Sequence, residues 1–289
     1  MILAILAGIC FVVQNLGNRA FSKYFEKGFY QLITVNALGL TIASAALFVL
    51  LRPKVIPATA MIFAAAFGAL FVAAISVIML AFSCGPLGMS NLIIDMYIMP
   101  TVLVGILLWH EKMTPVIGIA MVITIAALVL IAFPDKGGEG KAQRGWFLIA
   151  IAAMLLNAGL SIVQKGALTV CPEVKAGDFT FWSLTMGAVM SILIFAGMKL
   201  FGKKRFSPGQ PMKKLPFVAA AVGIGTAAAY WLENNALMSL PSIIVFPVVI
   251  SVNVGLLMVI SVIFYGEKLS VRRVIAFVAG LAGIIMMNL

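Results

Sequence analysis

Two acidic residues stand inside long apolar stretches of this chain, where a carboxyl group is costly. Asp95 lies in the run Ser90–Trp109, and Glu233 lies in the run Leu215–Leu237. Lipid offers a polar group no hydrogen-bond partner, so acids in such places are rare and mark ion or proton pathways. Both residues are therefore candidates for cation binding or proton coupling. The alternative for each is an interfacial residue bonded to nearby amides, Tyr or water.

Uncharged polar residues accompany the acids at helical spacing. Asn157, Ser161 and Gln164 are separated by four and then three positions, which places them on one face of a helix. One such stripe can form hydrogen bonds between packed helices, but several in one chain favour a shared water-filled cavity. The candidate substrate-binding residues are Asn15, Asn18, Asn36, Asp95, Asn157, Ser161, Gln164, Tyr230, Trp231, Glu233 and Asn234.

The segments that hold these groups must be helices that cross a lipid bilayer. Apolar residues make up 63% of the chain and charged residues 10%, against roughly 45–50% and about 25% in soluble domains. Backbone groups in lipid must be satisfied within their own segment, and a helix of about 20 residues crosses the ~30 Å hydrocarbon layer. The predicted spans are Ile2–Phe21, Phe29–Leu51, Ala58–Ser83, Ser90–Trp109, Pro115–Phe133, Trp146–Leu168, Phe179–Leu200, Leu215–Leu237, Ile243–Tyr265 and Val271–Met287.

The predicted spans also set the expected depth of the two acids. Each acid lies about five residues from an end of its span, or ~8 Å at 1.5 Å per residue. Asp95 follows the loop before the fourth span and Glu233 precedes the loop after the eighth, so we expect one acid toward each face of the membrane. Pro100 and Pro247 predict kinks in the fourth and ninth spans.

A phrase near the end of the fourth span returns near the end of the ninth. The sequence "LLWHEKMTPVIG" begins at Leu107 and "VIFYGEKLSVRR" at Val262, which places the two Glu-Lys pairs 156 residues apart. Since each copy would contain five spans, an odd number, the second copy must enter the membrane from the opposite face. The sequence therefore predicts an all-α membrane protein of ten transmembrane helices in two inverted five-helix repeats. The predicted units are residues 1–133 and 146–289, joined by a cytoplasmic linker over 134–145.

The doubled unit and its repeated phrase resemble the EamA-type branch of the drug/metabolite transporter superfamily. The second copy, "FYGEKLS", is closer to the family's pattern, whereas the first copy has His110 where the family usually has Gly. The resemblance covers essentially the whole chain. It implies a ten-helix secondary transporter, often an exporter of amino acids, metabolites or amines.

The charges within the spans restrict the substrate class. No Lys or Arg lies deep in any span. Arg19 and Lys165 stand at span ends. A phosphorylated or dicarboxylate substrate would need buried positive groups, so a cationic, zwitterionic or neutral metabolite is favoured. We find no nucleophile paired with a base, no phosphate-binding glycine loop and no metal-ligand cluster, so we predict no enzyme activity, cofactor or metal site. The alternative is a non-transport membrane protein, such as a lipid-acting enzyme or a scramblase.

The basic residues lie in short loops, so the net charge of +11 does not indicate nucleic-acid binding. Fifteen of the twenty Lys and Arg residues follow the odd-numbered spans, which by the positive-inside rule puts both termini outside the cell. The family resemblance implies the reverse orientation. The expected setting is the plasma or inner membrane, crossed many times, with a small-molecule substrate and a proton as candidate coupling ion. Both a monomer and a homodimer are compatible with the sequence.

Overall fold

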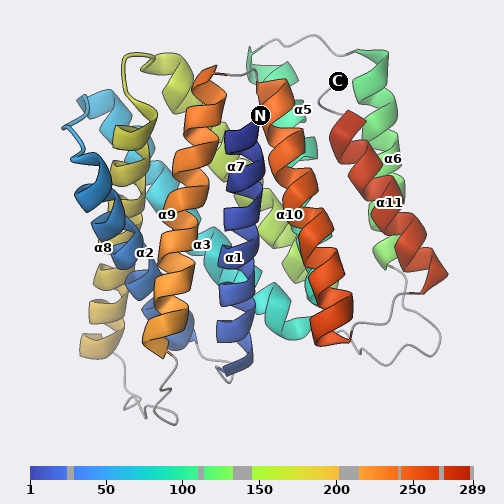
Figure 1. Cartoon of the computed structure of the whole chain (residues 1–289), viewed down its shortest axis with the longest axis horizontal. Coiled ribbons are helices and arrows are strands. Elements are labelled where there is room, and N and C mark those ends of the chain that lie inside the picture. Colours follow the sequence, from blue (N-terminus) through green and yellow to red (C-terminus); the bar gives the residue numbers. More distant parts are fainter. Residues whose placement is uncertain are drawn as a thin grey trace.

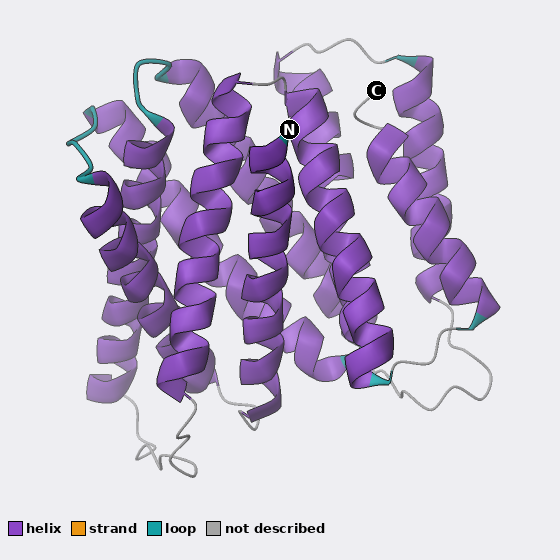
Figure 2. Ribbon diagram, viewed as in Figure 1, coloured by secondary structure: helices purple, strands orange, loops and turns teal. Residues whose placement is uncertain are grey.

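The structure is a computed structural model that describes residues 1–24, 29–109, 114–132, 145–201, 215–239, 242–266 and 270–286. Within these residues the chain forms eleven helices and no strand (Figures 1 and 2). The helices are α1 (Ile2–Tyr24), α2 (Phe29–Leu51), α3 (Ala58–Cys84), α4 (Leu87–Asp95), α5 (Ile98–Trp109), α6 (Pro115–Ala132), α7 (Trp146–Val170), α8 (Ala176–Phe201), α9 (Leu215–Ser239), α10 (Ser242–Tyr265) and α11 (Val271–Met286). The predicted linker, apart from Gly145, and both Glu-Lys pairs lie outside the described residues.

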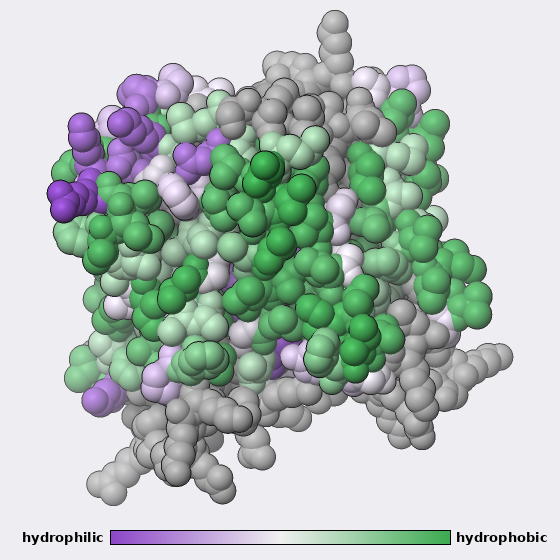
Figure 3. All heavy atoms as spheres, viewed as in Figure 1, coloured by the Kyte–Doolittle hydropathy of each residue, from purple (hydrophilic) through white to green (hydrophobic). Residues whose placement is uncertain are grey.

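The helices are apolar on their outer faces. By length and composition, six described helices could cross a membrane, namely α1, α2, α3, α7, α8 and α10. Large apolar side chains such as Leu193, Phe217 and Phe264 are mostly exposed, and Figure 3 shows apolar residues over much of the visible flank. A soluble protein would leave few such side chains in water, so this surface fits a lipid environment.

The fourth predicted span is interrupted in the structure. Helix α4 ends at Asp95, Met96 and Tyr97 form a turn, and α5 starts at Ile98. The cause is Pro100, which has no N–H to donate and whose ring clashes with the carbonyl four residues earlier, at Met96. The expected kink is thus a break, one turn before the proline. Helix α10, in contrast, continues through Pro247.

Helices of the first half pack mainly against helices of the second half. Helix α1 lies against α9 and α10, α2 against α8 and α9, α3 against α7 and α8, and α4 against α7 and α10. Helices α6 and α11 pack together at one side of the bundle (Figure 1). In the same view α1 descends from the N-terminus while α7 ascends, and α6 and α11 also run in opposite directions.

Two close backbone contacts hold the halves together. A Cβ atom on Gly68 of α3 would lie 2.5 Å from the backbone N of Gly187 in α8. A Cβ atom on Gly223 of α9 would lie 2.6 Å from the backbone O of Gly39 in α2. Only glycine permits these separations, and small residues are the usual means by which membrane helices approach closely.

Candidate functional site

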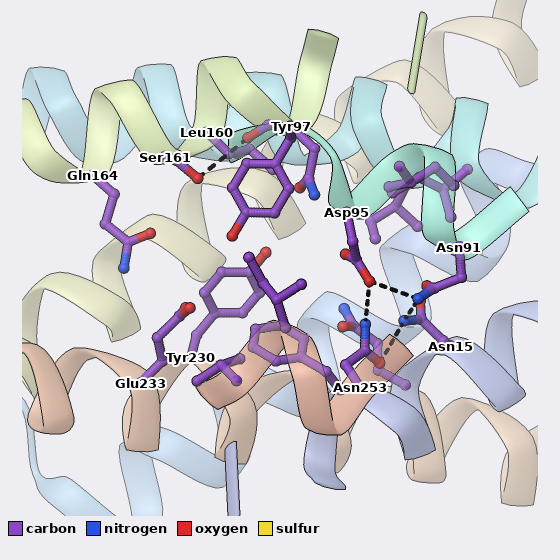
Figure 4. A pocket seen from close by; sticks show the side chains of 18 residues that line it. Asn15, Asn91, Asp95, Tyr97, Leu160, Ser161, Gln164, Tyr230, Glu233 and Asn253 are labelled. Atoms are coloured by element: carbon purple, nitrogen blue, oxygen red, sulfur yellow. Dashed lines mark hydrogen bonds between the residues drawn. The ribbon is translucent and has the colours of Figure 1, made fainter. Parts of the chain in front are cut away.

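A small, partly enclosed pocket lies between helices of the two halves (Figure 4). Its walls come from α1, α3, α4, α7, α9 and α10, together with the turn between α4 and α5. The lining residues are Phe11, Gln14, Asn15, Ile75, Ile78, Asn91, Ile94, Asp95, Tyr97, Asn157, Leu160, Ser161, Gln164, Tyr230, Glu233, Val249, Ile250 and Asn253. Both predicted intramembrane acids belong to this set, and none of these eighteen described residues is basic.

Three asparagines from three helices hold Asp95 at one end of the pocket. The Nδ2 groups of Asn91 and Asn253 donate to Asp95 Oδ2 at 2.6 and 2.7 Å. Asn15 Nδ2 in turn donates to Asn91 Oδ1 at 3.1 Å and to Asn253 Oδ1 at 3.3 Å. Among the described residues, Asp95 Oδ1 has no hydrogen-bond partner, and Figure 4 shows that oxygen on the side of the pocket. The network therefore fixes the carboxyl group while leaving one oxygen for a ligand.

Glu233 lies at the other end of the pocket, beside the Gln164 amide (Figure 4). Gln164 Nε2 donates to Asn234 Oδ1, and Asn234 Nδ2 donates to Thr180 Oγ1 at 2.7 Å. The Thr180 hydroxyl completes the chain by donating to the Ala176 backbone O at 2.7 Å. Helices α7, α8 and α9 thus position the glutamine next to the acid.

Two tyrosines separate these ends. Figure 4 shows Tyr97 and Tyr230 between the Asp95 group and the Glu233 group. The Tyr230 ring makes edge-on contacts with Phe11, Phe67 and Phe71, with ring centroids 5.1 to 5.6 Å apart. Such contacts between aromatic rings fix the orientation of the Tyr230 side chain. The middle of the pocket is thus aromatic, whereas its ends are acidic.

The structure brings together seven of the eleven predicted substrate-binding residues. Those on the pocket are Asn15, Asp95, Asn157, Ser161, Gln164, Tyr230 and Glu233. Asn234 lies behind Gln164, and Trp231 is partly buried away from the lining. Asn36 donates to Ser76 Oγ at 2.9 Å and to the Val72 backbone O at 3.3 Å, so it ties α2 to α3.

Asn18 is buried outside the pocket lining. Its Oδ1 and Nδ2 atoms have no hydrogen-bond partner among the described residues. The repeat offset aligns it with Gln164, but the two residues occupy different surroundings in the structure.

The expected depth of Asp95 was too small. Helix α4 begins at Leu87, three residues before the predicted start, so Asp95 lies about 12 Å along it at 1.5 Å per residue. The two acids occupy opposite ends of one pocket.

Four polar lining residues were not among the predicted substrate-binding residues: Gln14, Asn91, Tyr97 and Asn253. Asn91 precedes Asp95 by one helical turn, which was a usable signal. Asn253 was visible as an amide inside the ninth predicted span, but its bond to Asp95 was not, because that bond depends on α10 packing against α4. Within the part of the chain that the structure describes, no group of three or more His, Cys, Asp or Glu side chains could hold a metal ion.

Side-chain contacts join several helices at the end of the bundle opposite the N-terminus. Arg19 donates to the Gly85 backbone O at 3.1 Å and lies over the Tyr265 ring, 5.7 Å from its centroid. Trp146 Nε1 donates to Ser90 Oγ at 2.8 Å. These contacts, called here the closing contacts, connect α1, α4, α7, α10 and the α3–α4 turn next to Asn91.

Long apolar helices enclosing a polar pocket define a multi-pass integral membrane protein. The chain belongs to the EamA-like transporter family, whose model matches residues 144–289, and it is thus a membrane transporter of the drug/metabolite transporter superfamily. One solved crystal structure of a protein shares the fold with a TM-score of 0.62, covering 98% of this chain and 96% of that chain at 16% identity. No curated protein matches the chain.

Proposed function

We propose that this protein is a secondary active transporter that moves a small cationic, zwitterionic or neutral metabolite, such as an amino acid or amine, by alternating access. The central pocket binds the substrate between two inverted five-helix repeats. Export across the plasma or inner membrane is the direction implied by the family resemblance. Asp95 and Glu233 are the candidate groups for coupling to a proton.

The packing of the helices supports the inverted repeats. If α1 to α6 correspond in order to α7 to α11, with α4 and α5 together matching α10, the most extensive contacts between the halves have counterparts. Helix α1 against α9 mirrors α7 against α3, and α2 against α9 mirrors α8 against α3. The opposite chain directions of α1 and α7 in Figure 1 agree with inversion. Rocking of one repeat against the other is the usual form of alternating access in such folds.

The observation that carries the proposal is a buried pocket with two carboxyl groups and no basic residue among its described lining residues. A carboxylate in a membrane interior is stabilised by a cation, whereas an anionic substrate would add repulsion with nothing to offset it. Amine-bearing solutes therefore fit the pocket better than phosphorylated or dicarboxylate solutes.

The closing contacts support the alternating-access mechanism. Arg19 and Trp146 join helices of both halves on one side of the Asp95 network. An alternating-access carrier needs contacts that close one side and break when that side opens.

The pocket argues against a lipid-acting enzyme or scramblase, because Asn157 and Tyr230 line it together and do not form a groove toward lipid.

The test is flux into proteoliposomes containing the purified full-length chain. A panel of amines and amino acids is screened with an imposed pH gradient, and uptake of at least one solute above empty liposomes is expected. Asp95→Asn and Glu233→Gln should each abolish that flux. Glu173→Gln and Asp178→Asn are matched controls, since both acids lie outside the pocket lining and should leave flux unchanged. Absence of flux for every solute would refute the proposal.

A further inference from the structure

We infer that the pocket is shaped for a two-headed cation, a linear molecule with an ammonium group at each end, such as an α,ω-diamine. This inference rests on the proposed transport function and names its substrate class. It follows from the distribution of acceptor atoms along the pocket.

The pocket has one carboxyl group at each of its two ends, supplied by α4 and by α9 (Figure 4). Its described lining residues include no Lys, Arg or His that could neutralise either carboxyl group. A ligand with a single ammonium group reaches one end only, and the second carboxyl group is left without a cation. A ligand with two ammonium groups neutralises both.

The Asp95 end of the pocket has two oxygen atoms available to a donor. Asn15 uses its Nδ2 group on Asn91 and Asn253, and those two asparagines donate to Asp95 Oδ2. Asp95 Oδ1 and Asn15 Oδ1 are then left without a hydrogen-bond partner among the described residues. An ammonium group carries three donors and no acceptor, so two free oxygens are complementary to it.

The Glu233 end repeats this arrangement with different residues. Gln164 uses its Nε2 group on Asn234, which is itself tied to Thr180. The Gln164 Oε1 atom has no hydrogen-bond partner among the described residues, and the side chain lies beside Glu233 (Figure 4). Each end of the pocket therefore combines a carboxyl group with an amide oxygen.

Tyr97 and Tyr230 lie between the two ends (Figure 4), and Phe11 packs edge-on against the Tyr230 ring. Ile78 and Leu160 are apolar residues of the same lining. Aromatic and aliphatic side chains accept methylene groups, and none of the described lining residues places a carboxyl group in this middle section. Aromatic faces also attract an adjacent ammonium group. A carboxyl group at each end and a largely aromatic middle match the diamine pattern.

The test compares ligands of equal length on the wild-type protein in detergent. Diamines of increasing length and the corresponding n-alkylamines are titrated by calorimetry at one fixed pH. The best diamine should bind at least about tenfold more tightly than its monoamine, since a hydrogen bond to a charged group contributes about 1.5–3 kcal/mol. Affinity should fall on both sides of one optimal length. Equal affinities for the diamine and the monoamine would overturn the inference. A protonated second carboxyl group would give this result, because it would not attract the second ammonium group.

Variants then assign the two ends. In Asp95→Asn and in Glu233→Gln the diamine advantage should shrink to about onefold, while Glu173→Gln should retain it in full. An advantage that survives in both pocket variants would also overturn the inference. Because the length series uses the wild-type chain, it remains decisive if a variant fails to fold. Flux of amino acids or monoamines without any preference for diamines would reject this inference and leave the proposed transport function standing.

Discussion

Helices α3 and α9 correspond to each other under the proposed repeats, yet they contribute different side chains to the pocket. With an offset of 155 residues, Ile75 aligns with Tyr230 and Ile78 aligns with Glu233, and all four line the pocket. The same offset aligns Gly68 with Gly223, and both glycines make a close backbone contact with a neighbouring helix. The packing positions of the two helices are therefore alike, while their pocket positions have diverged.

The comparison separates two kinds of constraint. A glycine at a helix crossing must stay small in both halves, because a larger residue would push the backbones apart. A pocket position is constrained only by the ligand, and one acid at that level is enough. Two repeats with equivalent helix packing can thus form a pocket whose two sides differ. Four experiments test this difference, beginning with the largest expected effect.

Adding one methyl group at either helix crossing should be the most damaging change. Gly68→Ala and Gly223→Ala each insert a Cβ atom within 2.6 Å of a backbone atom, so the helices must separate. The expected loss is about 1–3 kcal/mol of stability for each variant, visible as a lower Tm and less monodisperse protein in detergent. Gly197→Ala is the matched control, since no atom lies within 4 Å of its added Cβ. Sensitivity at only one of the two crossings would contradict the equivalence of the halves.

Making α9 resemble α3 at the pocket should remove activity while preserving the fold. Glu233→Ile places in α9 the side chain that α3 already has at Ile78. We expect substrate flux to fall at least about tenfold, from the loss of one charge-assisted contact, with little change in Tm. The measurement is proteoliposome flux beside a melting curve. Ile78→Leu changes only the shape of the side chain and should retain most of the flux. Equal losses of flux in the two variants would show that the carboxyl group on α9 is no more important than the apolar side chain at the equivalent position of α3.

Removing the amide beside Glu233 should have a moderate effect. Gln164→Leu leaves Asn234 Oδ1 without its donor and the acid without its neighbour. A buried polar group without a partner costs about 1–3 kcal/mol, so Tm should fall and ligand binding should weaken. Thermal unfolding with and without bound amine measures both effects. An unchanged melting curve would show that the series of hydrogen bonds from Gln164 through Asn234 to Thr180 contributes nothing to stability.

The smallest effect is expected at Asn18, which aligns with Gln164 in the other half. Both side-chain polar atoms of Asn18 are buried without a hydrogen bond in the described structure, and the residue is outside the pocket lining. Asn18→Leu should therefore be neutral or stabilise the protein by about 1 kcal/mol, with flux unchanged. A marked loss of flux would show instead that Asn18 belongs to the site.

The sequence predicted the helices well because a membrane imposes a simple rule on composition. Apolar runs identified the positions of the helices; α2, for example, has the predicted bounds Phe29–Leu51. The sequence predicted a kink at Pro100, and the structure has a break before Ile98, since a proline disrupts the helix one turn upstream of itself.

The site was harder to predict, because helical spacing identifies a face but not its neighbour. The face of Asn157, Ser161 and Gln164 is directed to the pocket, whereas Asn36 is directed to Ser76 of α3. The repeat offset also suggested Asn18 for the site, although its half lacks the partners that Gln164 has. Which polar residues meet depends on contacts between distant segments, and no local pattern encodes them.

The hydrogen bonds around Asp95 form a closed circuit, from Asn15 to Asn91, to the carboxyl group, to Asn253 and back to Asn15. Helices α1, α4 and α10 each supply one asparagine to it. Moving any one of these helices away breaks two of the four hydrogen bonds. It also leaves amide groups on the other helices without a hydrogen-bond partner. The circuit therefore ties each of the three helices to the other two. A ligand that displaces the carboxyl group would break the direct bond between α4 and α10, while Asn15 of α1 would still bond to both.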